Sequence, residues 1–117
     1  MFFPILTTRD LGALLGFYRD LLGFTVTYEF PGPDGEPAYA GLELGPSQLG
    51  IGRDPELIDG PSARYSLWLY VDDCDATVER LRAARVSVVE EPADQPWGER
   101  IARVLDPDGN TVIVGQR

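Results

Sequence analysis

The sequence predicts the same succession of elements twice. Apolar runs and alternation predict strands over residues 1–8, 24–30, 38–44 and 48–52 in the first half, with a helix over 11–22 after the first strand. In the second half they predict strands over residues 64–71, 87–92, 99–105 and 110–116, with a helix that begins after Asp72 or Asp73. Each half therefore reads β-α-β-β-β. Two copies offset by about sixty residues do not fit a solenoid, which needs about three or more shorter repeats. We expect the copies to pair and complete one domain.

This pairing predicts an α+β fold in a single domain over residues 1–117. The first module covers about 1–53, a polar linker about 54–63, and the second module about 64–117. Asp10 is a predicted helix cap and Gly23 a helix end, and the DPDGN stretch is typical of a hairpin turn.

Histidine is absent from the whole sequence. Because histidine is the usual general base near neutral pH and the commonest ligand of transition metals, its absence excludes Ser-His-Asp triads, HExxH zinc sites and histidine facial triads. Much of hydrolytic and metal-dependent enzymology is excluded with it.

Acidic residues outnumber basic ones by 19 to 10, which gives a net charge of -9. Such a charge repels the phosphates of nucleic acids, so we expect no nucleic acid partner. It favours a cationic small molecule as a ligand. The alternative is that the acidic surface only keeps the protein soluble.

No apolar run reaches the length of a membrane span, and the amino-terminal residues lack the pattern of a signal peptide. The single cysteine, Cys74, excludes an internal disulfide and is compatible with a reducing compartment. We therefore expect a cytoplasmic protein with no membrane partner.

Several phrases, taken in order, resemble one known family. They are RDLGALLGFYRDLLGF in the first half, LYVDDCDATVERLRAARV in the second, and PWGER with DPDGN near the end. Together they resemble the vicinal oxygen chelate superfamily, which includes glyoxalase I, extradiol dioxygenases, and fosfomycin and bleomycin resistance proteins. The resemblance implies paired βαβββ modules whose curled mixed sheets form a cup with the helices outside.

The resemblance also implies where metal ligands would stand. Metal-using members bind a divalent ion through four strands, and the matching positions here are Phe3, Ser66, Ile113, and either Gly50 or Ile51. None of these side chains is a competent ligand for zinc, nickel, manganese or iron. We expect no metal and no other cofactor.

Strand alternation predicts which side chains line the cup. If Ser66 faces inward, so do Trp68 and Tyr70, while Leu67, Leu69 and Val71 face the helices. The predicted ligand-binding residues are Phe3, Ile5, Tyr39, Glu43, Ser66, Trp68, Tyr70, Trp97, Arg100 and Ile113. Such an aromatic, largely apolar pocket suits an organic ligand better than catalysis. The alternative is that these residues are simply core.

Within the family, the pattern looks most like bleomycin-resistance-type antibiotic-binding proteins. The early Pro4 and the PWG stretch over 96–98 are comparable to features of that group, whereas Arg85 stands where the family usually has glycine. The implied function is sequestration of a cytotoxic natural product, cationic or planar aromatic, by a homodimer. The rival interpretation is a metal-independent lyase, isomerase or tailoring enzyme that uses Glu43, Tyr39 or Arg100 for proton transfer. A structural or regulatory module is the third.

Overall fold

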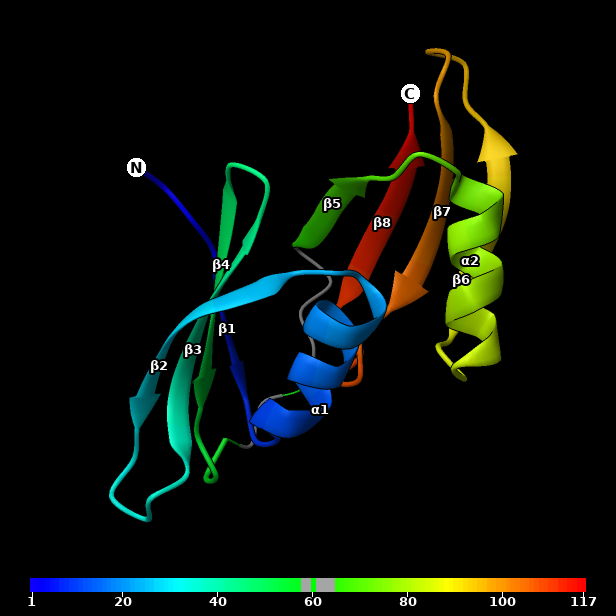
Figure 1. Cartoon of the computed structure of the whole chain (residues 1–117). Helices are drawn as coiled ribbons and strands as arrows, with labels where there is room; N and C mark the ends of the chain where they lie inside the picture. Colours follow the sequence, from blue (N-terminus) through cyan, green and yellow to red (C-terminus); the bar gives the residue numbers. More distant parts are fainter. Residues whose placement is uncertain (58–59, 61–64) are drawn as a thin grey trace. The chain divides into compact units, whose positions relative to one another are not determined.

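Each half of the chain folds as a β-α-β-β-β unit in the computed structural model, which describes residues 1–57, 60 and 65–117 (Figure 1). The units are Met1–Asp59 and Gly60–Arg117, so their boundary falls within the predicted linker. Linker residues 58, 59 and 61–64 lie outside the described residues.

The first unit holds one four-stranded sheet. Its elements are β1 (Ile5–Thr8), α1 (Leu11–Leu15), a π-helical continuation η1 (Gly16–Leu21), β2 (Thr25–Pro31), β3 (Pro37–Leu44) and β4 (Ser47–Arg53). The strand order is β1-β4-β3-β2, with β1 parallel to β4 and the other pairs antiparallel. The helix packs against β3 and β4.

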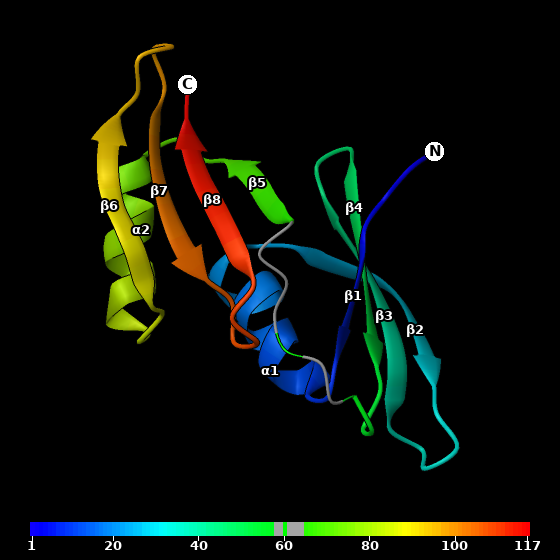
Figure 2. The same cartoon turned by 180° about the vertical axis from the view of Figure 1, so that it is seen from behind.

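The second unit repeats this arrangement. Its elements are β5 (Ser66–Tyr70), α2 (Cys74–Ala83), β6 (Val88–Asp94), β7 (Arg100–Leu105) and β8 (Thr111–Gln116). The strand order is β5-β8-β7-β6, with β5 parallel to β8, and α2 packs on one face of the sheet, behind the strands in Figure 2. The predicted α+β fold of paired βαβββ modules is confirmed, and neither sheet closes on itself.

The two sheets share the same register. Ile5 lies opposite Gly50 in the first sheet, and Trp68 lies opposite Ile113 in the second. Trp68 follows Ile5 by 63 residues, and Ile113 follows Gly50 by the same 63. Equivalent positions in the two units can therefore be assigned residue by residue.

The core of each unit lies between its helix and its sheet. The fully buried side chains include Leu14, Tyr18, Leu42 and Ile51 in the first unit and Val78, Leu81, Val104, Val112 and Val114 in the second. Each large apolar side chain buried in this way contributes roughly 1.5–3 kcal/mol. This packing leaves the opposite face of each sheet without its own helix, and we call it the open face.

Local signals place the helix ends. Asp10 and Asp73 cap the two helices, each accepting a hydrogen bond from a backbone N–H three residues later at 3.0 Å. Of the two caps considered for α2, Asp73 is thus the one used. Gly23, with a φ of 85°, follows the first helical segment as predicted. The first helix departs from the prediction in its π-helical second half, which buries the adjacent rings of Phe17 and Tyr18 in edge-to-face contact.

The structure can be compared with the sequence prediction at the start of β1 and at the DPDGN turn before β8. β1 begins at Ile5, later than the predicted start at Met1. The DPDGN turn forms as predicted, because Asp106 accepts hydrogen bonds from the backbone N–H groups of Asp108 and Asn110 at 2.9 and 2.8 Å. None of the helices in the described part of the chain is both long and apolar enough to cross a membrane.

Candidate functional site

Alternation along β5 separates two kinds of side chain. Leu67 and Leu69 are partly buried and share a face with Val112 and Val114 of β8, which are fully buried. Trp68 and Tyr70 lie on the open face, each 42% exposed. The predicted division of this strand agrees with the structure.

The two rings on β5 meet over a glycine. A Cβ added to Gly115 would lie 3.0 Å from Trp68 Nε1 and 3.3 Å from Tyr70 Cδ1, so the absence of a side chain there lets both rings lie close to the strand. The ring centroids are 6.0 Å apart and the planes are tilted by 59°. We call Trp68, Tyr70 and Gly115 the aromatic platform. Ile113, opposite Trp68, is buried beside it.

A carboxylate stands at the edge of the aromatic platform. Glu99 accepts a hydrogen bond from Trp97 Nε1 at 2.7 Å. It also accepts one from the Tyr70 hydroxyl, and this bond raises the pKa of Tyr70. The Arg117 guanidinium lies over the Tyr70 ring, with Cζ 4.1 Å from the ring centroid. Trp97 is thereby connected to the platform within one chain.

Two arginines of β7 lie on opposite faces of the second sheet. Arg103 shares the open face with Ile113 and pairs with Glu90 at 3.1 Å. Arg100, three residues earlier, falls on the face that carries α2, where it bonds Asp75 at 2.9 Å and Asp94 at 3.1 Å.

The placement of Arg100 therefore differs from the expectation that it lines the cup. Its carboxylate partners raise the pKa of the guanidinium, the bond to Asp75 most, so Arg100 stays charged. The difference arises because side chains alternate along a strand, and a separation of three residues reverses the face. Arg100 is a structural ion-pair residue in this unit.

The open face of the first sheet centres on Tyr39. Its hydroxyl lies where a Cβ at Gly50 would project, and Ile5 Cγ1 lies 3.1 Å from the same point. Gly50 pairs with Ile5 and Gly41 on this face, whereas Ile51 is fully buried on the helix side. The structure thus settles the register that the sequence left open, and Gly50 is the counterpart of Ile113.

A pocket of about 190 Å³ opens beside Tyr39. Three of the predicted ligand-binding residues of the first unit, Phe3, Tyr39 and Glu43, line it together with Tyr28 and Gln48. Ile5, also predicted, lies on the same sheet face and is 57% exposed. The predicted residues of the first unit therefore gather around one face, with a carboxylate and a phenol at one pocket.

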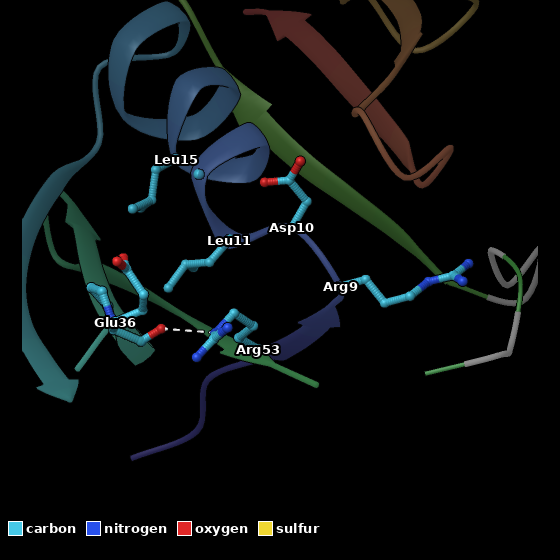
Figure 3. Close-up of a pocket in the computed structure, with 8 residues that line it drawn as sticks. Arg9, Asp10, Leu11, Leu15, Glu36 and Arg53 are labelled. Atoms are coloured by element: carbon cyan, nitrogen blue, oxygen red, sulfur yellow. Dashed lines mark hydrogen bonds between the residues drawn. The ribbon is translucent and has the colours of Figure 1, made fainter. Parts of the chain in front are cut away.

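A larger pocket of about 390 Å³ lies beside the start of α1 (Figure 3). Two of its polar residues have structural partners: Asp10 caps the helix, and Arg53 bonds the Pro37 carbonyl at 3.1 Å and Asp34 at 2.8 Å. This pocket is therefore a crevice between structural elements, and we assign the candidate site to the open faces.

The four positions that correspond to metal ligands in the family do not fit a divalent ion. They hold Phe3, Gly50, Ser66 and Ile113, and the Tyr39 phenol covers Gly50. Within residues 1–57, 60 and 65–117, no three His, Cys, Asp or Glu side chains gather closely enough to hold a metal. We derive no metal-dependent step.

The single cysteine is buried. Cys74 directs its Sγ toward the Val114 carbonyl at 3.4 Å, and burial raises the pKa of the thiol.

The sequence interpretation missed two residues on the open face of the second unit, Arg103 and Arg117. Arg103 was accessible from the DPDGN turn, because counting back from the Leu105–Thr111 pair places it opposite Ile113. The position of Arg117 over Tyr70 had no comparable signal, since no local pattern predicts where a side chain beyond a strand end will settle.

Comparison with known proteins finds relatives over nearly the whole chain. A sequence model of the Glyoxalase/Bleomycin resistance protein/Dioxygenase superfamily matches residues 3–114. An uncharacterized protein of Mycobacterium bovis is 30% identical over 122 residues, covering 97% of this chain and 80% of that protein. The anthracycline biosynthesis protein DauV of Streptomyces sp. (strain C5) is 34% identical over 106 residues, covering 89% of this chain and 36% of that protein.

A solved structure of similar fold covers nearly the whole chain. The crystal structure of a lactoylglutathione lyase from Agrobacterium tumefaciens is similar with a TM-score of 0.74 at 25% identity, covering 99% of this chain and 92% of that one.

Proposed function

This chain belongs to the Glyoxalase/Bleomycin resistance protein/Dioxygenase superfamily, and from that premise we propose that it is a metal-free small-molecule binding protein that sequesters a cytotoxic natural product. Sequestration needs affinity and abundance but no chemistry. It is the mode of action of the bleomycin-resistance-type proteins that the sequence resembles.

One observation carries the proposal: the aromatic platform is exposed on a sheet face where the family's metal ligands are missing. Trp68 and Tyr70 are each 42% exposed, and large exposed aromatic rings can stack on planar ligands. The matching ligand positions Ser66 and Ile113 offer a hydroxyl and an aliphatic group instead of metal donors. Binding is therefore better supported than metal-dependent turnover.

The proposed ligand-binding residues are those gathered on the open faces. They are Phe3, Ile5, Tyr39 and Glu43 in the first unit, and Ser66, Trp68, Tyr70, Trp97 and Ile113 in the second. We further propose that the two units complete one domain and that the cytoplasmic protein works as a homodimer, in which a second chain helps to close the site. Light scattering at micromolar concentration tests the dimer, and a monomer alone contradicts it.

A metal-independent enzyme remains the rival function, because Tyr39 and Glu43 line the same pocket. In that function the Glu43 carboxylate acts as the proton acceptor. Arg100, the third residue of that hypothesis, is held by Asp75 and Asp94 and does not share the pocket. Chemical change of a bound compound during incubation, detected by mass spectrometry, would favour the enzyme.

A thermal-shift screen tests sequestration directly. The panel should hold DNA-damaging natural products, including anthracyclines because one relative is named an anthracycline biosynthesis protein. A compound present at a hundred times its dissociation constant stabilises the folded state by about 2.7 kcal/mol, which is a measurable rise in Tm. We expect at least one such compound, recovered unchanged after release. A panel without any stabilising compound counts against the proposal.

A further inference from the structure

A planar cation from the chain itself covers the face of the Tyr70 ring. The guanidinium carbon of Arg117 lies 4.1 Å from the ring centroid, well inside the roughly 6 Å range of cation–π contacts. Tyr70 is partly exposed and Arg117 is exposed, so the contact forms at the rim of the open face. This ring face therefore binds a guanidinium from the same chain.

Glu99 adds a negative charge at the same place. Its carboxylate accepts hydrogen bonds from Trp97 Nε1 and from the Tyr70 hydroxyl, and these two donors fix it beside the ring. A cation over Tyr70 therefore gains attraction from the ring and from a carboxylate with a fixed position.

We propose that Tyr70 and Glu99 form a subsite for the cationic group of a planar ligand, and that Arg117 occupies this subsite until the ligand displaces it. The inference rests on the proposed function and deepens it, because it assigns the ligand a positive charge. When a cationic ligand replaces Arg117, a positive charge stays beside the Glu99 carboxylate. A neutral ligand that displaced Arg117 would leave the carboxylate without its neighbouring positive charge, so the subsite discriminates by charge.

Displacement of Arg117 costs little. Arg100 and Arg103 of the same unit are held by carboxylates, whereas Arg117 contacts the ring and the hydroxyl of Tyr70 at an exposed edge and forms no ion pair within the described residues. Cation–π contacts at exposed sites are among the weaker interactions of folded proteins. Arg117 is thus suited to protect the ring without blocking a ligand permanently.

Two isosteric probes test the subsite: the planar cation 2-naphthamidinium and its neutral analogue 2-naphthamide. The chain has two tryptophans, so a ¹⁵N-labelled sample gives two indole signals that report on Trp68 and Trp97 during a titration. We expect the cation to bind more tightly than the neutral probe. In Arg117→Ala the affinity for the cation should rise by about two- to fivefold, because its competitor is gone.

Matched variants separate local from overall charge. Arg103→Ala removes one positive charge from the same sheet face without touching Tyr70, and it should change the affinity for the cation less than Arg117→Ala does. Glu99→Gln should lower the affinity for the cationic probe and leave the affinity for the neutral probe unchanged. Circular dichroism confirms that each variant is folded.

Two results would overturn the inference. Equal affinity for the two probes excludes a cation subsite, and an Arg117→Ala variant that binds the cation no better than Arg103→Ala excludes occupancy by Arg117. The proposed function fails separately, if no natural product binds while the probes behave as expected. If a natural product binds but the probes do not discriminate, sequestration stands and the subsite is wrong.

Discussion

The phenol of Tyr39 lies across Gly50, at the point where a side chain on that residue would project. Gly50 is the counterpart of Ile113, and the family resemblance implies that both are positions of metal ligands in metal-using members. The first unit thus fills the place of one family ligand with a tyrosine from a neighbouring strand.

This relationship predicts a specific sensitivity at Gly50. Gly50→Ala should destabilise the protein by about 1–2 kcal/mol, because the added methyl overlaps Tyr39 and overpacking is costly. Gly52→Ala is the matched control, since a Cβ there would meet Tyr39 only at 4.0 Å. Urea unfolding measures both variants. In a Tyr39→Ala background, Gly50→Ala should lower the free energy of unfolding much less than it does in the parent. An equal loss in both backgrounds would show that overlap with Tyr39 is not the reason.

Metal analysis gives a second prediction. The purified protein should contain far less than one equivalent of zinc, nickel, iron or manganese, because the four inherited positions hold Phe3, Gly50, Ser66 and Ile113. Elemental analysis by mass spectrometry measures the content, and a chelator should leave Tm unchanged. About one equivalent of any of these metals per chain would contradict the assignment.

The tryptophans of the second unit should report on binding. A natural product found in the screen should quench tryptophan fluorescence, and Trp68→Ala or Trp97→Ala should weaken its binding by about tenfold, a loss of roughly 1.4 kcal/mol. Calorimetry measures the affinities. Tyr65→Ala, which removes another exposed aromatic, is the control and should bind as the parent does. Unchanged affinity in both tryptophan variants, with the fold intact, would exclude the aromatic platform as the binding surface.

The titration of Tyr70 follows from its neighbour Glu99. The hydrogen bond to Glu99 raises the pKa of Tyr70 above the ordinary 10.0, with a smaller opposing effect of Arg117. The interaction of protonated Tyr70 with Glu99 therefore stabilises the folded protein below the pKa that tyrosine has in the unfolded chain. This stabilisation is lost as the pH rises through the pKa of Tyr70 in the folded protein. NMR titration of the ring carbons should show the pKa falling in Glu99→Gln and rising in Arg117→Ala. Glu90→Gln removes a negative charge from the same sheet and should leave the pKa of Tyr70 unchanged. An equal shift of that pKa in Glu90→Gln would indicate only an effect of overall charge.

Arg85 predicts a stabilising substitution. It has a φ of 68° at the end of α2, where Val86 N–H bonds the Leu81 carbonyl and Arg85 N–H bonds the Arg82 carbonyl. This is the Schellman arrangement, which favours glycine because a Cβ is strained at positive φ. Arg85→Gly should stabilise the protein by about 1 kcal/mol in urea unfolding. Arg85→Ala removes the same charge without relieving the strain, so an equal gain in that variant would point to charge instead.

The sequence by itself determined the repeated β-α-β-β-β order, the cap at Asp10, a second cap at Asp72 or Asp73, and the two faces of β5. These features are local: helical spacing, capping and alternation depend on residues a few positions apart. The positions of Phe3, Ser66 and Ile113 in the metal site were implied by the family resemblance of short phrases, and the expectation that none of them binds a metal stays a prediction.

Only the tertiary structure decided which residues meet. Gly50 rather than Ile51 faces the open side because β4 pairs with β1 and β3 in one register. The contacts of Tyr39 with Gly50 and of Arg117 with Tyr70 join segments that are distant in sequence or lie on different strands. Such contacts depend on strand register and side-chain packing across the sheet, which no short stretch of sequence encodes.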